Sequence, residues 1–358
     1  MNASCIQYSM QKMKAVIHLK SICDNAKQFR SKARRLCAVV KANAYGHGAE
    51  EVTYALQGIV DCFAVALIEE AIAIRAAACG KGILVFTPPL TEEDAEAIIK
   101  NGFIGTISDL RSARLLMETA ARLKKSVKAH IKVNTGMNRY GIMPIWVGRI
   151  CAYLQEQQHV LITGIYSHLY TMDREISNVQ RKRFCKAIRI CKTYYPDVIA
   201  HLGGTYAAML GEEFCFDMVR VGIGLYGYLP TENAENDSLF DLKKGMTVYA
   251  VTTAKRKYHY GGCGYGIVGD CPQGMSLSVD RFGYADGFLR RKENGVIGAE
   301  THANNLCMDA CIRRANNKVG QWRMILSDAD CMARQTGTIS YEVLCAATRR
   351  AEFIYEYD

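Results

Sequence analysis

Short apolar runs rich in β-branched residues recur from residue 36 to about residue 222, with segments of helical spacing between them. This alternation predicts repeated strand–helix units, because β-branched runs favour strands, whereas apolar positions three and four residues apart favour helices. The clearest predicted helices are 69–78 and 109–122. The eight predicted strands are 36–41, 62–66, 82–86, 103–107, 127–133, 160–166, 198–202 and 218–222.

Eight such units predict an N-terminal (β/α)₈ TIM barrel over residues 1–230, with an open, doubly wound sheet as the alternative. The chain turns polar at 228–233, and apolar alternation with glycine turns follows. The segments 247–252 and 276–279 are strand-like in residue choice. We therefore expect a C-terminal mainly-β domain over residues 231–358. The first residues, up to about residue 15, could pack with that domain.

The composition fits a globular protein with a barrel and a smaller domain. The chain has 358 residues, of which 49% are hydrophobic and 22% are charged. No apolar stretch approaches the roughly 18 residues of a membrane span, and residues 1–20 lack the apolar centre of a signal peptide. We expect a cytoplasmic protein with no membrane partner.

The cysteines and the net charge argue against a disulfide-stabilised, a metal-binding and a nucleic-acid-binding protein. The 15 cysteines are scattered through apolar runs, which indicates reduced core residues. Cys307 and Cys311 have no second pair at zinc spacing, so we expect no metal. The net charge is +10, but its basic clusters, 181–192 and 313–314, are interpreted as solvated helix faces. We expect no nucleic acid, although the positive field favours small anions.

In such a barrel the site lies at the carboxyl ends of the strands. A lone cation there is usually satisfied by solvent, but several around one barrel mouth predict a site for an anionic ligand. The cations that close or follow the predicted strands are Lys41, Lys132, His168, His201 and Arg220.

Lys41 closes the apolar run 38–40, and burial there favours the neutral amine that forms an imine with an aldehyde. Gly46 and Gly48 allow a tight turn into the next helix. The segment 220–224 lies where barrels commonly bind phosphate. These features fit a phosphate-bearing cofactor, and they equally fit an aldolase acting on a sugar phosphate.

The segment 38–48, Ala-Val-Val-Lys-Ala-Asn-Ala-Tyr-Gly-His-Gly, resembles the cofactor-lysine signature of alanine racemases. This resemblance covers nearly the whole chain. It implies pyridoxal phosphate as cofactor, the barrel and β-domain arrangement of the family, and a head-to-tail homodimer. Further family-like blocks follow in family order at 132–141, 167–169, 220–227, 264–266, 283–287, 307–309 and 337–342.

By this resemblance, Lys41 holds pyridoxal phosphate and acts as one base, while Tyr265 of the partner subunit acts on the opposite face. Racemisation needs two bases, because one removes the α-proton and the other returns it from the far side. His168 and Arg220 would help Tyr265 to lose its proton. Arg220 would also face the pyridine nitrogen and restrain side reactions.

The resemblance also implies contacts to the substrate and to the phosphate. Arg139 would bind the substrate carboxylate and would be held by Lys132, which the family often carries as a carbamate. Met308 and Asp309 would enter from the other subunit, near the substrate. The residues implied to bind the cofactor phosphate are Tyr45, Thr205, Gly222, Ile223 and Tyr341.

The chain departs from the family pattern at several positions. Gly203-Gly204-Thr205 stands where Ala-Asn-Ser is usual, which removes a side chain near the phosphate and predicts weaker cofactor binding. Asn134 replaces a usual Asp and Ala310 a usual Gln, and Gln321 stands where an Asp is common. The segment 300–305 is unlike the family and is interpreted as a remodelled loop at the substrate entrance.

The implied activity is interconversion of L- and D-alanine, which supplies D-alanine for peptidoglycan. Tyr341 and Met308 would crowd the substrate and favour alanine over serine, although a pocket rejects one added oxygen poorly. The alternatives are a serine or broad-specificity racemase and a cofactor-binding homologue without turnover. A decarboxylase is a third, and the retention of Tyr265 and Arg139 argues against it.

Overall fold

The computed structural model describes residues 13–230, 239–262, 272–289, 296–297, 300–301 and 306–357. These residues fall into two compact units. The barrel unit comprises Ile22–Ala44 and Ala49–Lys243. The β-rich unit comprises the described residues up to Ser21, the segment Tyr45–Gly48, and those from Lys244 onward.

The barrel unit has eight parallel strands, and the expected closed barrel is confirmed. The first strand pairs with both the second and the last, so the alternative of an open sheet is wrong. Leu84 bridges to Ile104 between the third and fourth strands, and Arg220 N–H on the eighth strand donates to Gly203 O, just after the seventh, at 3.2 Å. The strands are β2 (Leu36–Val39), β3 (Cys62–Val65), β4 (Gly82–Val85), β5 (Gly105–Ile107), β6 (Val127–Lys132), β7 (Val160–Tyr166), β8 (Ile199–His201) and β9 (Val219–Val221).

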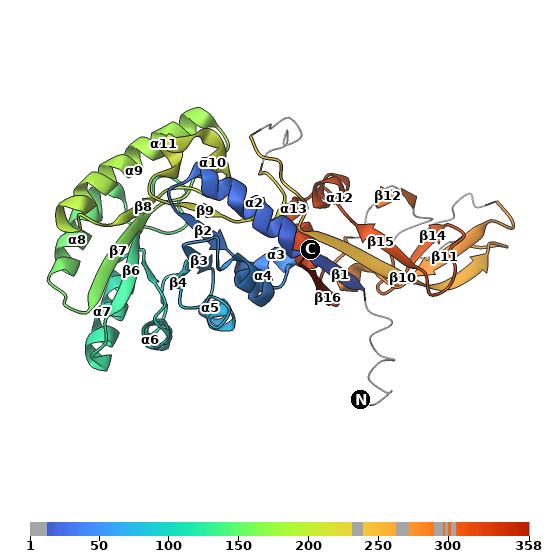
Figure 1. Ribbon diagram of the computed structural model, residues 1–358, viewed down its shortest axis with the longest axis horizontal. Coiled ribbons are helices and arrows are strands. Elements are labelled where there is room, and N and C mark those ends of the chain that lie inside the picture. The colour runs from blue at the N-terminus through green and yellow to red at the C-terminus, as the bar shows by residue number, and fades with distance from the viewer. Residues whose placement is uncertain are drawn as a thin grey trace. The chain divides into compact units, whose positions relative to one another are not determined.

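Helices alternate with these strands, as Figure 1 shows. Several begin at side chains that cap the first free N–H groups. The side chain of Thr91 accepts a hydrogen bond from Asp94 N–H at the start of α6. At two later helices, the side chains of Asp109 and Asp173 each accept a hydrogen bond from an N–H group of the first turn. The helices are α2 (Leu19–Lys32), α3 (Lys41–Gly46), α4 (Ala49–Leu56), α5 (Ile68–Ile74), α6 (Glu92–Asn101), α7 (Leu110–Leu123), α8 (Val147–Gln155), α9 (Arg174–Tyr194), α10 (Thr205–Leu210), α11 (Glu212–Cys215), and the 3₁₀ turns η1 (Pro144–Trp146) and η2 (Ile223–Tyr226).

The β-rich unit is built around one long strand. Strand β10 (Met246–Lys257) pairs antiparallel with β1 (Lys14–His18), β11 (Ser276–Asp280) and β15 (Trp322–Leu326). The strands predicted at 247–252 and 276–279 are therefore confirmed. The remaining elements are β12 (Val296–Ile297), β13 (Glu300–Thr301), β14 (Cys311–Arg314), β16 (Glu352–Glu356), the 3₁₀ turn η4 (Tyr284–Asp286), α12 (Ala329–Thr336) and α13 (Ser340–Ala346).

The two basic clusters have different surroundings. The cluster 181–192 lies on α9, with Lys182, Arg183 and Lys186 exposed, as expected of a solvated helix face. The same interpretation is wrong for Arg313, because it lies on strand β14 and is buried with its Nε 2.8 Å from a carboxylate oxygen of Asp280. A buried ion pair of this kind is an internal contact of the sheet.

In the part of the chain that the structure describes, no helix combines the length and the apolar character that crossing a bilayer requires.

Candidate active site

Lys41 begins α3 directly after strand β2, and the backbone that follows it is unusual. Ala42, Asn43, Ala44 and Tyr45 all have φ between +52° and +54°. This left-handed conformation costs about 1–2 kcal/mol for each non-glycine residue. Strain of this kind persists only where the surroundings hold it, and it is concentrated at functional sites. The sequence predicted a tight turn here but not a left-handed one.

The two glycines of the lysine motif are required by close packing within the β-rich unit. Gly46 has φ of +81°, and a Cβ added there would lie 2.3 Å from Leu344 O. Gly48 has φ of +86°, and its Cβ would lie 2.1 Å from Tyr355 Oη. Neither contact leaves room for a side chain.

Glu70, which the sequence did not single out, holds the turn after Lys41. Its Oε1 accepts the Ala42 N–H at 2.7 Å. Its Oε2 accepts the N–H groups of Ala66 and Leu67, at 2.8 and 3.1 Å, where strand β3 passes into α5. The acidic first turn of α5 is the only sequence signal, and it indicates a helix cap rather than a contact to the lysine turn.

Arg220 is buried on β9 and donates several hydrogen bonds. Its Nη1 donates to His201 Nδ1 at 2.8 Å and to His201 O at 3.0 Å, and its Nη2 donates to Ser167 O at 2.7 Å. Nη2 also lies 3.4 Å from His168 Nδ1. Burial lowers the pKa of Arg220 to about 10, so it remains a cation at neutral pH. No described residue provides an acceptor for its Nε–H, which leaves one donor for a ligand.

Two buried histidines, His201 and His130, extend the hydrogen-bond network of Arg220. Because the guanidinium only donates, His201 Nδ1 must accept, and its proton must sit on Nε2, 3.0 Å from His130 Nδ1. Burial, and then the charge of Arg220, lower the pKa of both histidines, that of His130 to about 3. Tyr166 stacks on His201 with ring centroids 5.1 Å apart. Both histidines are therefore neutral at physiological pH.

Lys132 ends β6 as a buried amine. Its Nζ lies 4.7 Å from the centre of the Tyr166 ring. Burial first, and then the charges of Arg220 and Arg139, hold its pKa well below the usual range for lysine. No carboxylate of a described residue lies within 4.0 Å of this nitrogen. A neutral buried amine of this kind can add carbon dioxide to form a carbamate.

The loops that carry Arg139 and His168 are tied together by Gln180, a buried residue of α9 that the sequence did not single out. Its Nε2 donates to Thr135 Oγ1 and to His168 O, both at 3.0 Å. Asn134 arranges the turn before Arg139, because its Oδ1 accepts from Gly136 N–H at 3.0 Å. Arg139 itself is exposed.

The predicted phosphate residues of the barrel lie together at two helix starts. Thr205 begins α10, and Ile223 begins η2 after Gly222. The first N–H groups of a helix have no acceptor within it and suit an anion. Thr205 Oγ1 accepts from Gly224 N–H at 3.1 Å, so its own hydroxyl proton is left to donate. This donor set fits a phosphate.

Gly204, one of the departures from the family pattern, adjoins the same residues. A Cβ at Gly204 would lie 3.3 Å from Arg220 O and 3.7 Å from His168 Cε1. The second of these is an ordinary contact, whereas the first is tight. The glycine therefore leaves space beside His168 that a side chain would enter.

The remaining predicted site residues belong to the β-rich unit or fall outside the described chain. The rings of Tyr45 and Tyr341 lie 5.9 Å apart. Asp309 accepts a hydrogen bond from Arg350 Nη2 at 2.8 Å, and Met308 is half exposed. Tyr265 and the loop residues 302–305 lie outside the described residues.

Several of the basic residues predicted for the site influence one histidine, His168. Burial lowers the pKa of His168, and then the charges of Arg220, Lys132, Arg139 and Lys41 lower it further. Among these groups, the Arg220 guanidinium borders the histidine directly, because its Nη2 lies 3.4 Å from His168 Nδ1, and it stays positively charged at neutral pH. An anionic ligand with phosphate and carboxylate groups suits that charge.

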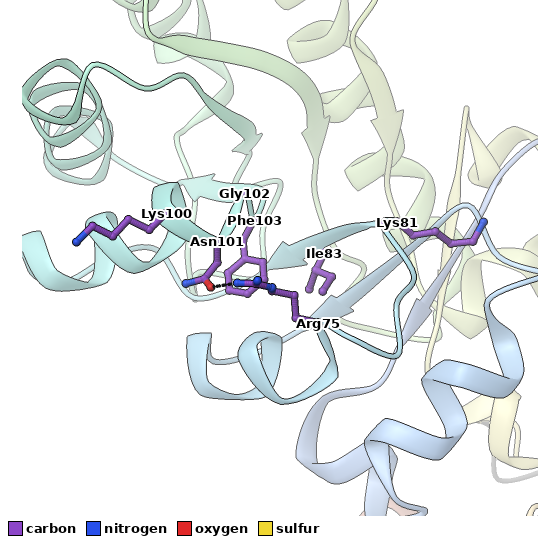
Figure 2. A pocket seen from close by; sticks show the side chains of 8 residues that line it. Arg75, Lys81, Ile83, Lys100, Asn101, Gly102 and Phe103 are labelled. Carbon is purple, nitrogen blue, oxygen red and sulfur yellow. Dashed lines mark hydrogen bonds between the residues drawn. The ribbon is translucent and has the colours of Figure 1, made fainter.

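A separate cavity of about 340 Å³ lies at the opposite ends of the strands. Its lining includes Ile83 at the start of β4 and Phe103 just before β5. Figure 2 shows Arg75 hydrogen-bonded to Asn101 and the amines of Lys81 and Lys100 extending away from the other lining residues. These cations therefore do not converge on a ligand, and the cavity is distinct from the site around His168.

Two family models match the chain. The model described as "Alanine racemase, N-terminal domain" matches residues 17–230, and the one described as "Alanine racemase, C-terminal domain" matches residues 246–355.

Curated proteins and solved structures agree with this match. An alanine racemase of Francisella philomiragia is 32% identical over 337 residues, with 88% of this chain and 92% of that protein covered. An alanine racemase of Nostoc sp. is 33% identical, with 93% of each covered. The solved alanine racemase of Clostridium difficile 630 is 28% identical, with 96% of each chain covered and a TM-score of 0.88.

Proposed function

The chain belongs to the alanine racemase family, and from this premise we propose that it interconverts L- and D-alanine with pyridoxal phosphate as cofactor. The observation that carries the proposal is that the two family models match in order over nearly the whole chain, with the motif lysine, Lys41, just after strand β2. The product would supply D-alanine for peptidoglycan, as membership of this family implies.

The residues of the barrel fit the proposed cofactor. Thr205 O–H and the N–H groups of Gly222 and Ile223 would bind its phosphate, with Tyr45 and Tyr341 contributing hydroxyls. The absence of a side chain at Gly203 and Gly204 supports weaker binding of the cofactor than is usual in the family. Pyridoxal phosphate, when bound, draws electrons from the substrate's α-carbon and makes its hydrogen acidic.

Arg220 would meet the pyridine nitrogen of the cofactor. Its Nη groups are engaged by His201, Ser167 and His168, so the Nε–H is the donor that remains. A guanidinium with a pKa of about 10 does not transfer its proton to a pyridine nitrogen at neutral pH. Arg220 would therefore keep the ring nitrogen unprotonated, which favours racemisation over transamination.

Lys41 and Tyr265 of the partner subunit would be the two bases. One would remove the α-proton of an enantiomer while the other delivers a proton to the opposite face, and the two roles are exchanged for the reverse reaction. His168 supports this assignment, because a histidine that accepts at Nδ1 from Arg220 carries its proton on Nε2. That N–H could donate to the phenolic oxygen of Tyr265 and stabilise its anionic form.

Arg139 would bind the substrate carboxylate, and a carbamate on Lys132 would orient the guanidinium. The depressed pKa of Lys132 supports this modification. Met308 and Asp309 of the partner subunit would border the substrate and favour the small methyl group of alanine. The ion pair between Asp309 and Arg350 supports a fixed position for that segment.

A head-to-tail homodimer is part of the proposal, because Tyr265 and Met308 belong to the β-rich half and would complete the partner's site. Sedimentation should therefore show a dimer as the active species. A cytoplasmic location is proposed as well. It is supported by the described cysteines, which form no disulfide with one another.

The proposal is tested with purified protein, pyridoxal phosphate and a chiral assay on L- and D-alanine. We expect an absorbance band on cofactor uptake, borohydride fixation of the cofactor on Lys41, and loss of both in Lys41→Ala. Equal turnover of L-serine would instead indicate a broad-specificity racemase. Cofactor uptake without inversion of any amino acid would indicate a binding homologue, and release of carbon dioxide a decarboxylase.

A further inference from the structure

The carboxylate of Glu70 makes two kinds of contact. One oxygen, Oε2, accepts the N–H groups of Ala66 and Leu67, which is an ordinary cap at the start of α5. The other oxygen, Oε1, accepts the N–H of Ala42, the residue after Lys41. One side chain therefore joins the end of strand β3 to the turn that carries the lysine.

The chain contains a matched carboxylate that makes only the first kind of contact. Asp94 caps α6 after the next strand, and its Oδ2 accepts Leu90 N–H at 2.8 Å and Thr91 N–H at 3.1 Å. These distances are the same as those at Glu70 Oε2. Aspartate is therefore long enough for the cap. The additional methylene of Glu70 is what reaches Ala42.

The contact lies where the backbone needs support. Ala42 is the first of four consecutive non-glycine residues with φ in the left-handed region. Within this turn, Ala44 N–H donates to Val40 O at 2.9 Å, whereas Ala42 N–H is satisfied by Glu70. The residue that follows Lys41 is thus bonded to a side chain 28 residues further along the chain.

We propose that Glu70 is a positioning residue for Lys41, because its Oε1 fixes the left-handed turn and so places the lysine amine for the cofactor and the substrate. The inference rests on the proposed function of Lys41. Glu70 itself would touch neither cofactor nor substrate.

The test compares Glu70→Asp with Asp94→Glu in the full-length protein. Glu70→Asp keeps the charge and the cap but loses the contact to Ala42, whereas Asp94→Glu makes the reverse change at a cap away from the lysine. Glu70→Gln and Asp94→Asn form a second pair, in which chain length is kept and charge is removed. Thermal unfolding of the four variants measures the cost of altering a cap.

Three measurements respond to the position of Lys41. In Glu70→Asp, hydrogen exchange of 42–46 should accelerate while 66–67 stay protected. The dissociation constant for pyridoxal phosphate should rise by roughly three- to tenfold, as expected for the loss of one hydrogen bond that holds the turn. The kcat for L-alanine should fall with KM little changed. Asp94→Glu should stay within about twofold of the native protein in all three.

The outcomes separate the two proposals. If Glu70→Asp matches Asp94→Glu in exchange, cofactor affinity and kcat, Glu70 is only a helix cap and the inference is overturned. If the native protein takes up no pyridoxal phosphate, the proposed function fails and the role of Glu70 in it fails too. Native uptake with an effect confined to the Glu70 variants supports both.

Discussion

Arg220 donates a hydrogen bond from Nη1 to Nδ1 of His201 at 2.8 Å, and this contact sets the protonation of the barrel interior. It requires the tautomer of His201 with its proton on Nε2, which in turn makes His130 Nδ1 an acceptor at 3.0 Å. A guanidinium and two neutral rings thus form one chain of directed hydrogen bonds.

The first prediction is a loss of stability in mild acid. The pKa values of His130 and His201 are lowered in the folded state, that of His130 to about 3, whereas an unfolded histidine has a pKa of about 6.5. Below about pH 6.5 these two histidines bind protons in the unfolded chain but stay neutral in the folded protein. The stabilisation is therefore present above that pH and is lost as the pH falls, by up to about 1.4 kcal/mol per pH unit for each histidine.

Urea unfolding at several values between pH 7.5 and 5 measures this slope. His130→Gln should be less stable at pH 7.5, but its slope below pH 6.5 should be smaller by about 1.4 kcal/mol per unit. Equal slopes in the two proteins would show that His130 titrates normally.

The second prediction concerns Gly164, which makes room for the His130 ring. A Cβ at Gly164 would lie 2.6 Å from Cδ2 and Nε2 of that ring. Gly164→Ala should displace His130, weaken its bond with His201, and destabilise the protein by about 1–3 kcal/mol. Gly58→Ala is the control, because no atom lies within 4 Å of its added Cβ. If both variants unfold at the same temperature, the fit of His130 against Gly164 has no energetic importance.

The third prediction concerns modification of Lys132. Its lowered pKa leaves a neutral amine, so protein equilibrated with ¹³C-bicarbonate should show a carbamate signal by NMR. The signal should vanish in Lys132→Ala and persist in Lys128→Ala, because Lys128 lies exposed on the same strand. A signal unchanged by Lys132→Ala would place the carbamate elsewhere.

The fourth prediction separates the two bases. Tyr265→Phe removes the hydroxyl proposed to serve one enantiomer but leaves Lys41 in place. Racemisation should fall by about 10²–10⁴-fold while cofactor binding persists. In deuterated water, one enantiomer should still exchange its α-proton through Lys41 without inversion.

Tyr260→Phe is the control for this change, because Tyr260 is exposed and lies five residues away in the chain. It should racemise alanine at the native rate. A native rate in Tyr265→Phe as well would rule out the two-base mechanism.

The sequence by itself determined the architecture and the family. Eight apolar runs predicted eight parallel strands, because burial on both faces leaves a continuous apolar pattern that needs no knowledge of neighbours. The motif around Lys41 identified the alanine racemases, and the family models confirm that resemblance.

Only the tertiary structure decided which polar groups meet. The contact of Glu70 with Ala42, the tautomers set by Arg220, and the left-handed turn after Lys41 have no local signal, because each depends on strand register and barrel closure. The same holds for β1, which pairs with β10 and β16 far along the chain, and for Tyr45–Gly48, which pack within the β-rich unit. Local periodicity reports how much of a residue is buried, whereas the partner of a buried polar atom is set by residues distant in the sequence.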